Sequence, residues 1–481
     1  MAPRPTLQQT AIIDAFVPGD KNLVVEAGAG SGKTTTLKAA AKAAPNRKGL
    51  YIAYNKSIQV EAAKSFPSSV TCKTAHGLAY GAIGKHYARR LKQPRMRAEQ
   101  VARILRINEP FYTTEGIISP EHIARIVMAT VNKFTNSKYR NILSQPVPWQ
   151  PGFDSKEVRD LLAKEIPPLA QRVWDDIRDR NGRLPFTHDC YLKMWSLTGP
   201  QLPYEYVMLD EAQDSNPPVS LIVEGQRNAQ KILVGDSAQA IYGWRGAEDA
   251  MANFDGVRLA LSQSFRFGSA VADEANKWLE YIDAPLRLTG FDQINSRIVP
   301  VAEPDAILCR TNAKTISEAM AAMKNGRRVA LVGDSKAIGP IKSLAEAAIQ
   351  LKAGAGCSHP ELFAFQTWGD LQDYVENEEA GRDLAPFVKL IDEHGADVII
   401  DICGRFVSED RADLVLSTAH KAKGREWHRV KVADDFAEPK KTDDGSLGTI
   451  PRADAMLAYV TVTRAQYELD REGLAWIDNY V

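Results

Sequence analysis

The sequence predicts an α/β protein built from two parallel sheets, each interrupted by a helical insertion. Short runs rich in Val, Ile and Leu recur along the 481 residues, and amphipathic segments separate them. Twice this pattern gives way to longer, charged, helix-like stretches. Buried parallel strands are typically near-continuous apolar runs, so the short runs indicate strands and the segments between them indicate covering helices.

The first group of predicted strands comprises residues 23–27, 50–54, 70–74, 206–210, 231–234 and 258–262. Between the third and fourth of these runs the chain changes to helix-like segments at 97–105, 121–130 and 156–180. The change indicates a helical domain inserted into the first α/β domain.

The second group of predicted strands comprises residues 306–310, 328–332, 414–418 and 429–433, and a helical, acidic stretch interrupts it. We therefore expect a first domain with one insertion and a second domain with a smaller one. The expected boundaries are 1–85 and 187–268 for the first domain, 86–186 for its insertion, 269–345 and 406–481 for the second domain, and 346–405 for its insertion.

Composition is that of a soluble globular protein, with 44% hydrophobic and 25% charged residues. We expect no membrane association, because no apolar run is long enough to cross a bilayer. The N-terminus also lacks the apolar core of a secretion signal. The five cysteines are scattered without a Cys-x-x-Cys pair, which favours a reducing compartment over disulfides or a zinc site. These features predict a cytoplasmic protein.

The formal net charge is zero, but the charges are segregated. Residues 85–106 hold eight Lys or Arg and one acid, whereas residues 361–380 hold six acids and no Lys or Arg. A local basic surface attracts phosphates. A solvated helix face explains the basic run equally well, so this feature alone does not decide the function.

A phosphate-binding loop comes directly after the first predicted strand. Glycines allow backbone N–H groups to close on phosphate oxygens, and the following helix adds its positive N-terminus. Lys33 would neutralise the β- and γ-phosphates, and the Thr34 hydroxyl would bind Mg²⁺. Ala27 stands where the strict pattern has glycine. The predicted nucleotide-binding residues of this loop are Gly28, Gly30, Ser31, Gly32, Lys33, Thr34 and Thr35.

Two adjacent carboxylates, Asp210 and Glu211, end the apolar run 206–210. Asp210 would hold Mg²⁺ through water, and Glu211 would orient and deprotonate the attacking water. A helix cap is the alternative, but two neighbouring acids repel each other without a cation. The pair therefore predicts hydrolysis of a nucleoside triphosphate.

The loop at residues 235–246 leaves the carboxyl end of another predicted strand, where ligands bind in open α/β sheets. Gln239 offers a neutral amide that can sense a phosphate. Trp244 and Arg245 suit a nucleobase and its backbone. The loop therefore predicts that a nucleotide site is coupled to a nucleic-acid site.

Two further loops at the same predicted sheet edge mix aromatic, amide and basic groups. Stacking of a base on an aromatic side chain is worth about 1–3 kcal/mol and tolerates any sequence. Tyr54 and Trp244 are the candidate stacking platforms; for Tyr80 a core position is at least as good an explanation. The other candidate nucleic-acid contacts are Asn55, Lys56, Thr74, His76 and Arg245.

Asp-Glu-Ala-Gln-Asp at 210–214, together with the loop at 235–246, resembles superfamily 1 helicases of the UvrD/Rep type. The similarity spans nearly the whole chain. It implies two RecA-like parallel-sheet P-loop domains, each with a mainly helical insertion, and ATP with Mg²⁺ as cofactors. Further motifs lie at 8–9, 264–266, 417–427 and 459–465. Through them the resemblance implies contacts of Gln8 and Phe265 with adenine, of Glu426 with ribose, of Arg266 and Arg464 with the γ-phosphate, and of His420 with DNA.

Arginine fingers of this kind contribute about 10³–10⁵ in rate. Since the resemblance places both arginines across a cleft from Lys33, it implies that hydrolysis depends on closure of that cleft. Closure would also shift the contact of Trp244 with a base.

Several variants are similar to the F-box DNA helicase branch of this family. They lie at 54–56, 66–67, 74–80, 134–137 and 191–195. No N-terminal extension that could hold an F-box precedes the first motif, and the chain ends soon after Arg464, so ubiquitin-ligase assembly and a C-terminal interaction arm are not expected. Residues 467–477, with Gly473 as a turn, predict a strand-separating hairpin.

The leading hypothesis is an ATP- and Mg²⁺-dependent translocase on single-stranded DNA that acts as a helicase in replication, repair or recombination. The resemblance implies 3′→5′ movement. We expect a monomer that binds single-stranded and tailed duplex DNA, on the nucleoid or in a host cytoplasm if the source is viral. One alternative is an ATP-driven remodeller that strips proteins from DNA without separating strands. A P-loop switch or kinase is another, but it leaves Tyr54, Trp244 and Arg464 unexplained.

Overall fold

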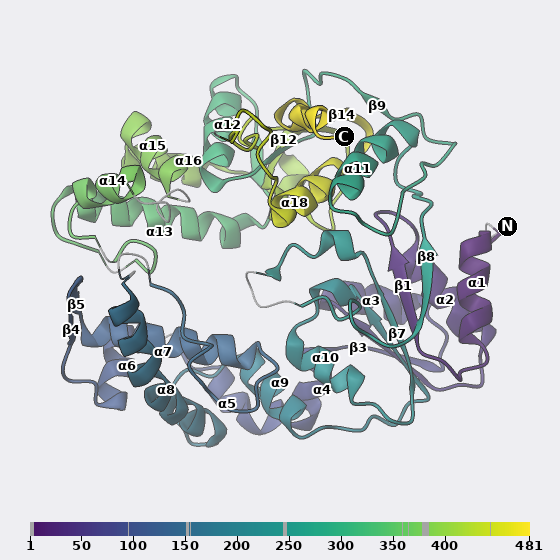
Figure 1. Ribbon diagram of the computed structural model, residues 1–481, viewed down its shortest axis with the longest axis horizontal. Helices are drawn as coiled ribbons and strands as arrows, with labels where there is room; N and C mark the ends of the chain where they lie inside the picture. The colour runs from purple at the N-terminus through teal and green to yellow at the C-terminus, as the bar shows by residue number, and fades with distance from the viewer. Residues whose placement is uncertain are drawn as a thin grey trace. The chain divides into compact units, whose positions relative to one another are not determined.

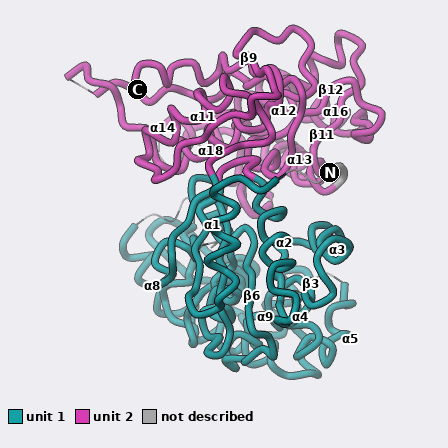
Figure 2. The backbone as a smooth tube through the Cα atoms, turned by 90° about the vertical axis from the view of Figure 1, so that its right-hand side faces the viewer, with its two compact units in different colours: residues 1–27, 32–261 teal, residues 28–31, 262–481 magenta. Residues whose placement is uncertain are grey.

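The computed structural model describes most of the chain, and its backbone is shown in Figure 1. The described residues are 4–94, 96–150, 153, 155–243, 248–357, 359–363, 365–377, 384–442 and 444–481. The chain divides into two compact units, which Figure 2 distinguishes by colour. The first unit comprises Met1–Ala27 and Gly32–Leu261, and the second comprises Gly28–Ser31 and Ser262–Val481. No helix within the described ranges has the length and apolar character that crossing a membrane requires.

The first unit contains a six-stranded sheet in which every neighbouring pair is parallel. Its order is β3-β2-β6-β7-β1-β8. All six predicted strands are present, with ends shifted by a residue at most. Their bounds are β1 Leu23–Ala27, β2 Gly49–Ala53, β3 Val70–Thr74, β6 Tyr206–Asp210, β7 Gln230–Gly235 and β8 Val257–Leu261.

Helices accompany this sheet, and the first three of them share an apolar core with its strands. The helices are α1 Leu7–Phe16, α2 Lys33–Ala43, α3 Lys56–Ser65, α4 Ala75–Ala82 and α10 Pro217–Glu224. Phe16 of α1 and Leu37 of α2 are fully buried against strand residues such as Leu23 and Tyr206. The core therefore fixes the carboxyl ends of the strands, from which the site loops leave.

The chain between β3 and β6 is mainly helical, as predicted. Its elements are η1 Gly84–Tyr87, α5 Ala88–Leu91, α6 Ala98–Leu105, β4 Phe111–Thr113, β5 Gly116–Ile118, α7 Pro120–Thr135, α8 Lys156–Arg178 and α9 His188–Leu197. Helices α7 and α8 pack through Phe134 and Trp174, whose rings meet edge to face at 5.1 Å. The antiparallel pair β4-β5 was not predicted from the sequence.

The second unit contains another parallel six-stranded sheet, in the order β11-β12-β10-β13-β14-β9. The strands are β9 Arg297–Ile298, β10 Ala306–Cys309, β11 Val329–Leu331, β12 Leu414–Thr418, β13 Trp427–Val432 and β14 Ala465–Asp470. The prediction of two parallel-sheet domains is confirmed. Strands β9 and β14 escaped prediction because β9 has two residues and β14 is largely polar.

The predicted hairpin at 467–477 is wrong. The segment begins in β14, which pairs in parallel with β13 and β9, and continues into the 3₁₀ helix η7, Glu472–Asn479. Gly473 marks a close approach, because a Cβ atom there would lie 1.8 Å from the Ala433 carbonyl oxygen. The glycine is therefore needed for packing against the loop after β13.

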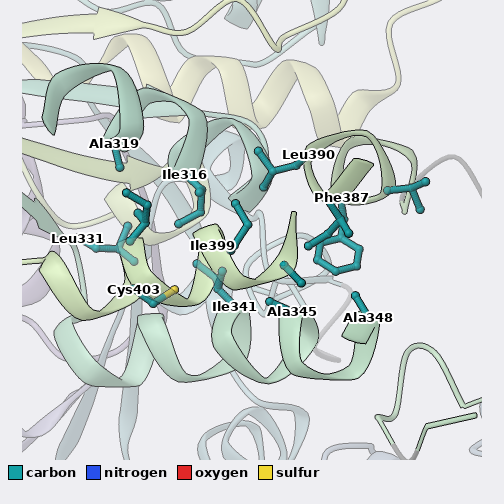
Figure 3. Close-up of a cluster of buried hydrophobic side chains, with 14 of the residues drawn as sticks. Ile316, Ala319, Leu331, Ile341, Ala345, Ala348, Phe387, Leu390, Ile399 and Cys403 are labelled. Carbon is teal, nitrogen blue, oxygen red and sulfur yellow. The ribbon is translucent and has the colours of Figure 1, made fainter. Parts of the chain in front are cut away.

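Helices α11 Ser269–Tyr281, α12 Asn312–Lys324, α17 Ala419–Ala422 and α18 Arg452–Val462 accompany the second sheet. Between β11 and β12 lie α13 Asp334–Lys352, α14 Trp368–Asn377, α15 Ala385–His394 and α16 Ala396–Arg405. Ile316, Leu331, Ile341, Leu390 and Ile399 belong to one buried cluster (Figure 3). These helices therefore share a core with α12 and β11. Helix α13 continues across the predicted domain boundary between residues 345 and 346.

Candidate functional site

The glycine-rich loop joins β1 to α2. Gly30 and Gly32 have φ values of 72° and 78°, in the left-handed region that favours glycine. A Cβ atom on Gly30 would also lie 2.6 Å from the Arg266 Cβ and from the Ser264 Oγ. Helix α2 begins at Lys33, so the N–H groups of its first turn face the loop without helical partners. This arrangement is an anion-binding site.

The loop also contains a hydroxyl suited to a phosphate. Ser31 is 2% exposed, and its Oγ is buried without a hydrogen-bond partner among the described residues. A buried hydroxyl of this kind is costly unless a ligand or water completes it. Thr34 is half-buried and Thr35 is exposed. The residues present therefore fit the phosphates of a nucleoside triphosphate.

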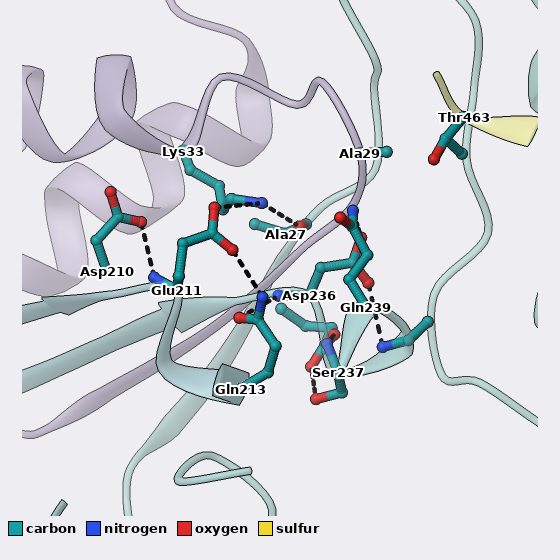
Figure 4. A network of polar contacts seen from close by, with 12 residues as sticks. Ala27, Ala29, Lys33, Asp210, Glu211, Gln213, Asp236, Ser237, Gln239 and Thr463 are labelled. Carbon is teal, nitrogen blue, oxygen red and sulfur yellow. Dashed lines mark hydrogen bonds and ion pairs between the residues drawn. The ribbon is translucent and has the colours of Figure 1, made fainter. Parts of the chain in front are cut away.

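Glu211 lies opposite Lys33 in the first unit (Figure 4). The two charged groups are 3.7 Å apart, from Lys33 Nζ to Glu211 Oε1. Glu211 has φ 52°, which is uncommon for a residue with a side chain. The Gln213 side-chain amide donates to Glu211 Oε2 at 2.6 Å. The carboxylate is thus held from both sides.

Asp210 is buried at the end of β6, beside the same loop. The Tyr51 hydroxyl donates to Asp210 Oδ2, and the Glu211 N–H donates to Oδ1 at 3.0 Å. Burial, followed by repulsion from Glu211, raises the pKa of Asp210, while the Tyr51 hydrogen bond opposes the rise. A divalent cation would favour the ionised form.

Within the described ranges no set of three or more His, Cys, Asp or Glu side chains forms a metal cage. Mg²⁺ is usually held by one or two carboxylates together with substrate phosphates and water. The pair formed by Thr34 and Asp210 fits that type of site.

A second polar network joins β1 to the loop after β7. The Gln239 side-chain amide donates to Asp236 Oδ2 at 2.6 Å, and the Asp236 N–H donates to Gln213 Oε1 at 3.1 Å. The Ser237 N–H and hydroxyl donate to the two oxygens of Glu26, at 2.7 and 3.0 Å. Gln213 therefore bonds to both carboxylate-bearing loops, at Glu211 and at Asp236.

Burial, and then the charge of Asp236, raise the pKa of Glu26 to about 7. Sequence reasoning assigned no role to Glu26, Tyr51, Gln213 or Asp236. The signal for the first two is a polar side chain within an otherwise apolar strand.

Arg266 and Glu426, both predicted for the nucleotide, form an ion pair in the second unit. Arg266 Nε donates to Glu426 Oε2 at 2.5 Å, and Arg266 Nη1 donates to the Thr463 carbonyl oxygen at 3.3 Å. The Phe265 N–H donates to the Gly30 carbonyl oxygen at 2.8 Å. Arg266 is therefore next to the glycine-rich loop, whose residues 28–31 belong to this unit by their contacts.

Arg464 is 1% exposed, and its guanidinium group donates hydrogen bonds to residues that shortly precede it in the sequence. Nε donates to the Val460 carbonyl oxygen at 2.8 Å, and Nη2 donates to Thr463 Oγ1 at 2.9 Å. Tyr459, in α18, accepts a hydrogen bond through its hydroxyl from the Ala29 N–H at 3.2 Å. Tyr459, Arg266 and Glu426 thus gather near the loop, and Arg464 lies beneath them in the core.

Gln8 and Gln9 both lie in the first turn of α1. Gln9 forms a capping box with Thr6, since the Thr6 N–H donates to Gln9 Oε1 at 3.0 Å and the Gln9 N–H donates to Thr6 Oγ1 at 3.2 Å. Gln8, at the preceding position of α1, is half-buried. The contact of Gln8 with adenine stays a prediction.

Tyr54 and His76 line one pocket of about 360 Å³ in the first unit. Asn136 and Tyr242 extend its wall, and Asp210 with Glu211 closes another part of it. His76 Nε2 is 3.0 Å from Asp189 Oδ1. The pocket therefore borders both the predicted DNA loops and the hydrolytic carboxylates.

The other predicted DNA residues have more local surroundings. Asn55 and Thr74 cap helices α3 and α4 through their side-chain oxygens. Lys56 is exposed and bonds to Gln59 at 2.6 Å. His420 is half-buried in α17 of the second unit. Trp244 and Arg245 lie outside the described residues.

A parallel sheet with a glycine-rich loop and a neighbouring strand ending in two carboxylates is the arrangement found in P-loop nucleoside triphosphatases. The chain has a second parallel six-stranded sheet, and two sheets of this kind correspond to a pair of RecA-like domains. Residues 55–255 match the family described as UvrD/REP helicase N-terminal domain.

Two relatives align over nearly the whole chain. It is 29% identical to F-box DNA helicase protein 1 of Schizosaccharomyces pombe, over 96% of this chain and 57% of that protein. It is 27% identical to F-box DNA helicase 1 of Gallus gallus, over 96% of this chain and 48% of that protein. DNA helicase IV of Escherichia coli is 27% identical over 32% of this chain and 25% of its own length. The chain is thus similar to UvrD-like helicases, and it spans about half the length of the two F-box relatives.

Proposed function

We propose that the protein is an ATP-driven translocase on single-stranded DNA that separates duplex strands. The observation that carries this proposal is the shared pocket of about 360 Å³. Tyr54 and His76, suited to a base and its backbone, line the same hollow as Asp210 and Glu211. A strand bound there would contact the loop that bears the hydrolytic carboxylates, which supports coupling of DNA binding to ATP hydrolysis.

ATP would bind with its phosphates in the loop at residues 28–34. Mg²⁺, held by Thr34 and Asp210, would supply charge neutralisation at the phosphates. The Lys33 ammonium group would leave its ion pair with Glu211 and contact a phosphate oxygen instead. Glu211, still held by Gln213, would then orient the attacking water and accept its proton.

The second unit would supply the further positive charge that the γ-phosphate needs during hydrolysis. Arg266 would leave Glu426 for the γ-phosphate, and Glu426 would be free to contact the ribose. Phe265, 38% exposed, presents a face on which adenine can stack. Arg464 would act as the second arginine finger. Hydrolysis would therefore need residues of both units, and opening after hydrolysis would advance the strand.

We propose 3′→5′ movement, a monomeric enzyme and a role in replication, repair or recombination, on the strength of the family. The division into 1–85 with 187–268, 86–186, 269–345 with 406–481, and 346–405 is our proposal for the domains. Single-stranded and tailed duplex DNA are the proposed substrates. The proposed location is the nucleoid, or a host cytoplasm if the source is viral.

The test is unwinding of duplexes that carry a 3′ tail, a 5′ tail or no tail. We expect ATP-dependent separation of the 3′-tailed duplex, and little of the other two. Faster separation of the 5′-tailed duplex would overturn the polarity. Displacement of a DNA-bound protein without separation of any duplex would favour the remodeller.

A further inference from the structure

A second pocket of the first unit, of about 590 Å³, lies at the base of the helical insertion. It is formed by α5, by the chain that leads to α6, and by the turn at residues 180–185 after α8. It shares no lining residue with the pocket of Tyr54 and Asp210. The proposed ATPase does not use it.

The floor of this pocket is a buried arginine. Arg90 is 2% exposed, and its guanidinium donates to the carbonyl oxygens of residues 176, 177, 179 and 184 at 2.6–3.0 Å. Nη2 also donates to Asp176 Oδ1 at 2.9 Å. Arg90 is therefore charge-compensated and structural, and it fixes the turn that carries the rim.

Gly182 makes that turn tight. A Cβ atom there would lie 2.1 Å from the Asp176 carbonyl oxygen and 2.6 Å from Arg90 Nη1. The Arg183 N–H donates to Asp176 Oδ2 at 2.9 Å. The backbone between Arg180 and Arg183 is thus held in one position, which pre-organises the side chains that it presents.

The rim carries three exposed arginines, Arg89, Arg180 and Arg183. Within the described part of the chain none of them forms an ion pair, and no carboxylate from that part lines the pocket. The nearest acids in sequence are engaged elsewhere, Asp176 by Arg90 and Asp179 by the N–H of Asn181 at 2.9 Å. Three like charges around one hollow repel each other, and a bound anion relieves that repulsion.

The lining also indicates which part of an anionic ligand the pocket would contact. Gln93, Gln100 and Asn181 add amide donors, and the described lining residues include no aromatic side chain. Arginine binds phosphate in a bidentate manner, whereas bases in single strands are bound mainly by stacking on aromatic rings. The pocket therefore suits phosphate and sugar rather than a base.

We propose that this basic pocket binds the phosphodiester backbone of DNA outside the site that couples to ATP. The inference rests on the proposed function, which makes DNA the ligand. It also assigns different roles to two residues of the basic run at 85–106. Arg90 is structural, whereas Arg89 lies in the pocket with two arginines about 90 positions further along the chain.

The test removes the rim charges together, as Arg89→Gln, Arg180→Gln and Arg183→Gln in one variant. A control variant removes three charges from the exposed part of α8, as Lys156→Gln, Arg159→Gln and Lys164→Gln. The dissociation constant for tailed duplex and for single-stranded DNA is measured over a series of salt concentrations. Each phosphate contact contributes about 0.7–0.9 to the slope of log Kd against log salt.

We expect the rim variant to lower that slope by about two, and the control variant to leave it near the wild-type value. ATP hydrolysis at saturating single-stranded DNA should stay within about twofold of wild type. Loss of slope on the tailed duplex alone assigns the pocket to the duplex arm, whereas equal loss on both substrates assigns it to the single strand. A rim variant with the wild-type slope on both substrates overturns the proposal.

Two further measurements separate this inference from others. Thermal unfolding shows whether the rim variant is folded, and the triple Arg→Lys variant should keep the slope because it keeps the charge. If wild-type protein binds DNA with a steep salt dependence but separates no duplex, the proposed function fails and the pocket can still be tested. If it unwinds DNA while the rim variant equals the control, the pocket alone is refuted.

Discussion

The two parallel sheets differ in the short segment that joins a central strand to its helix. After β1, the chain passes through residues 28–32 before α2 begins, and two glycines there adopt φ values that leave backbone N–H groups open to an anion. In the second unit, β10 reaches α12 after Arg310 and Thr311. The N–H groups of these two residues donate to the Asp435 carboxylate, each at 2.8 Å.

A resident carboxylate therefore fills, in the second sheet, the role that a phosphate would have in the first. The Thr311 hydroxyl is a third donor to this carboxylate, at 2.9 Å from Asp435 Oδ2. Each parallel sheet thus provides an anion site at the start of a helix, and Asp435 occupies the site in the second sheet. The second unit accordingly would contribute arginines rather than a nucleotide loop.

The largest expected effect comes from comparing the lysines of the two helices. Lys33→Ala should lower ATP hydrolysis by about 10²–10³-fold, because the β- and γ-phosphates lose their counter-charge. Lys314→Ala in α12, which removes ion pairs to Glu318 and Asp434, should change hydrolysis less than about threefold. Steady-state ATPase rates measure both, with binding to single-stranded DNA as the folding control. Equal losses in the two variants would contradict the assignment.

Removing the resident carboxylate should damage stability rather than chemistry. Asp435→Ala leaves three donors without a partner and should destabilise the second unit by about 3 kcal/mol. Chemical unfolding measures the change. Asp434→Ala, whose carboxylate is 76% exposed, is the matched control and should cost less than about 1 kcal/mol. A higher KM for ATP in the folded Asp435→Ala protein would show that the second sheet also holds the nucleotide.

Glu26 marks a further difference, since the corresponding penultimate position of β10 is the fully buried Leu308. Burial raises the pKa of Glu26 from 4.5 to about 7, so the folded state binds this proton more tightly than the unfolded state. The stability that results is complete below pH 4.5 and is lost as the pH rises through 7.

Glu26→Gln should remove that pH dependence. Relative to wild type, the variant should gain about 2 kcal/mol in the free energy of unfolding between pH 5 and pH 7. Denaturant titrations at the two pH values measure the difference. A constant offset between the two proteins across this range would mean that Glu26 stays ionised.

The smallest expected effect concerns Tyr51, whose hydroxyl donates to Asp210. Tyr51→Phe should lower kcat about tenfold, because Asp210 loses a hydrogen bond that favours its ionised form. The same loss raises the pKa of Asp210 further, so the acid limb of the pH–kcat profile should move to higher pH. Tyr206→Phe is the control, since the Tyr206 hydroxyl has no hydrogen-bond partner in the described part of the chain. Identical pH profiles for the two variants would refute the positioning role of Tyr51.

Local patterns predicted most of the fold. Ten strands could be predicted because their apolar runs are nearly continuous. The phosphate loop could be predicted because its glycines lie close together in the sequence. Strands β9 and β14 have no such pattern. The polar networks were not predictable, since Tyr51 bonds to Asp210 across 159 positions and Ser237 bonds to Glu26 across 211. Likewise, the basic run itself does not predict that Arg90 is buried and structural whereas the neighbouring Arg89 is exposed.

The central claim is that nucleotide hydrolysis in the first sheet responds to DNA. The most direct measurement is the rate of ATP hydrolysis by the wild-type protein with and without single-stranded DNA, alongside Glu211→Gln. We predict a DNA-dependent increase of about tenfold or more in the wild type and no increase in the variant, which should still bind the strand. A wild-type rate that DNA leaves unchanged would contradict the claim.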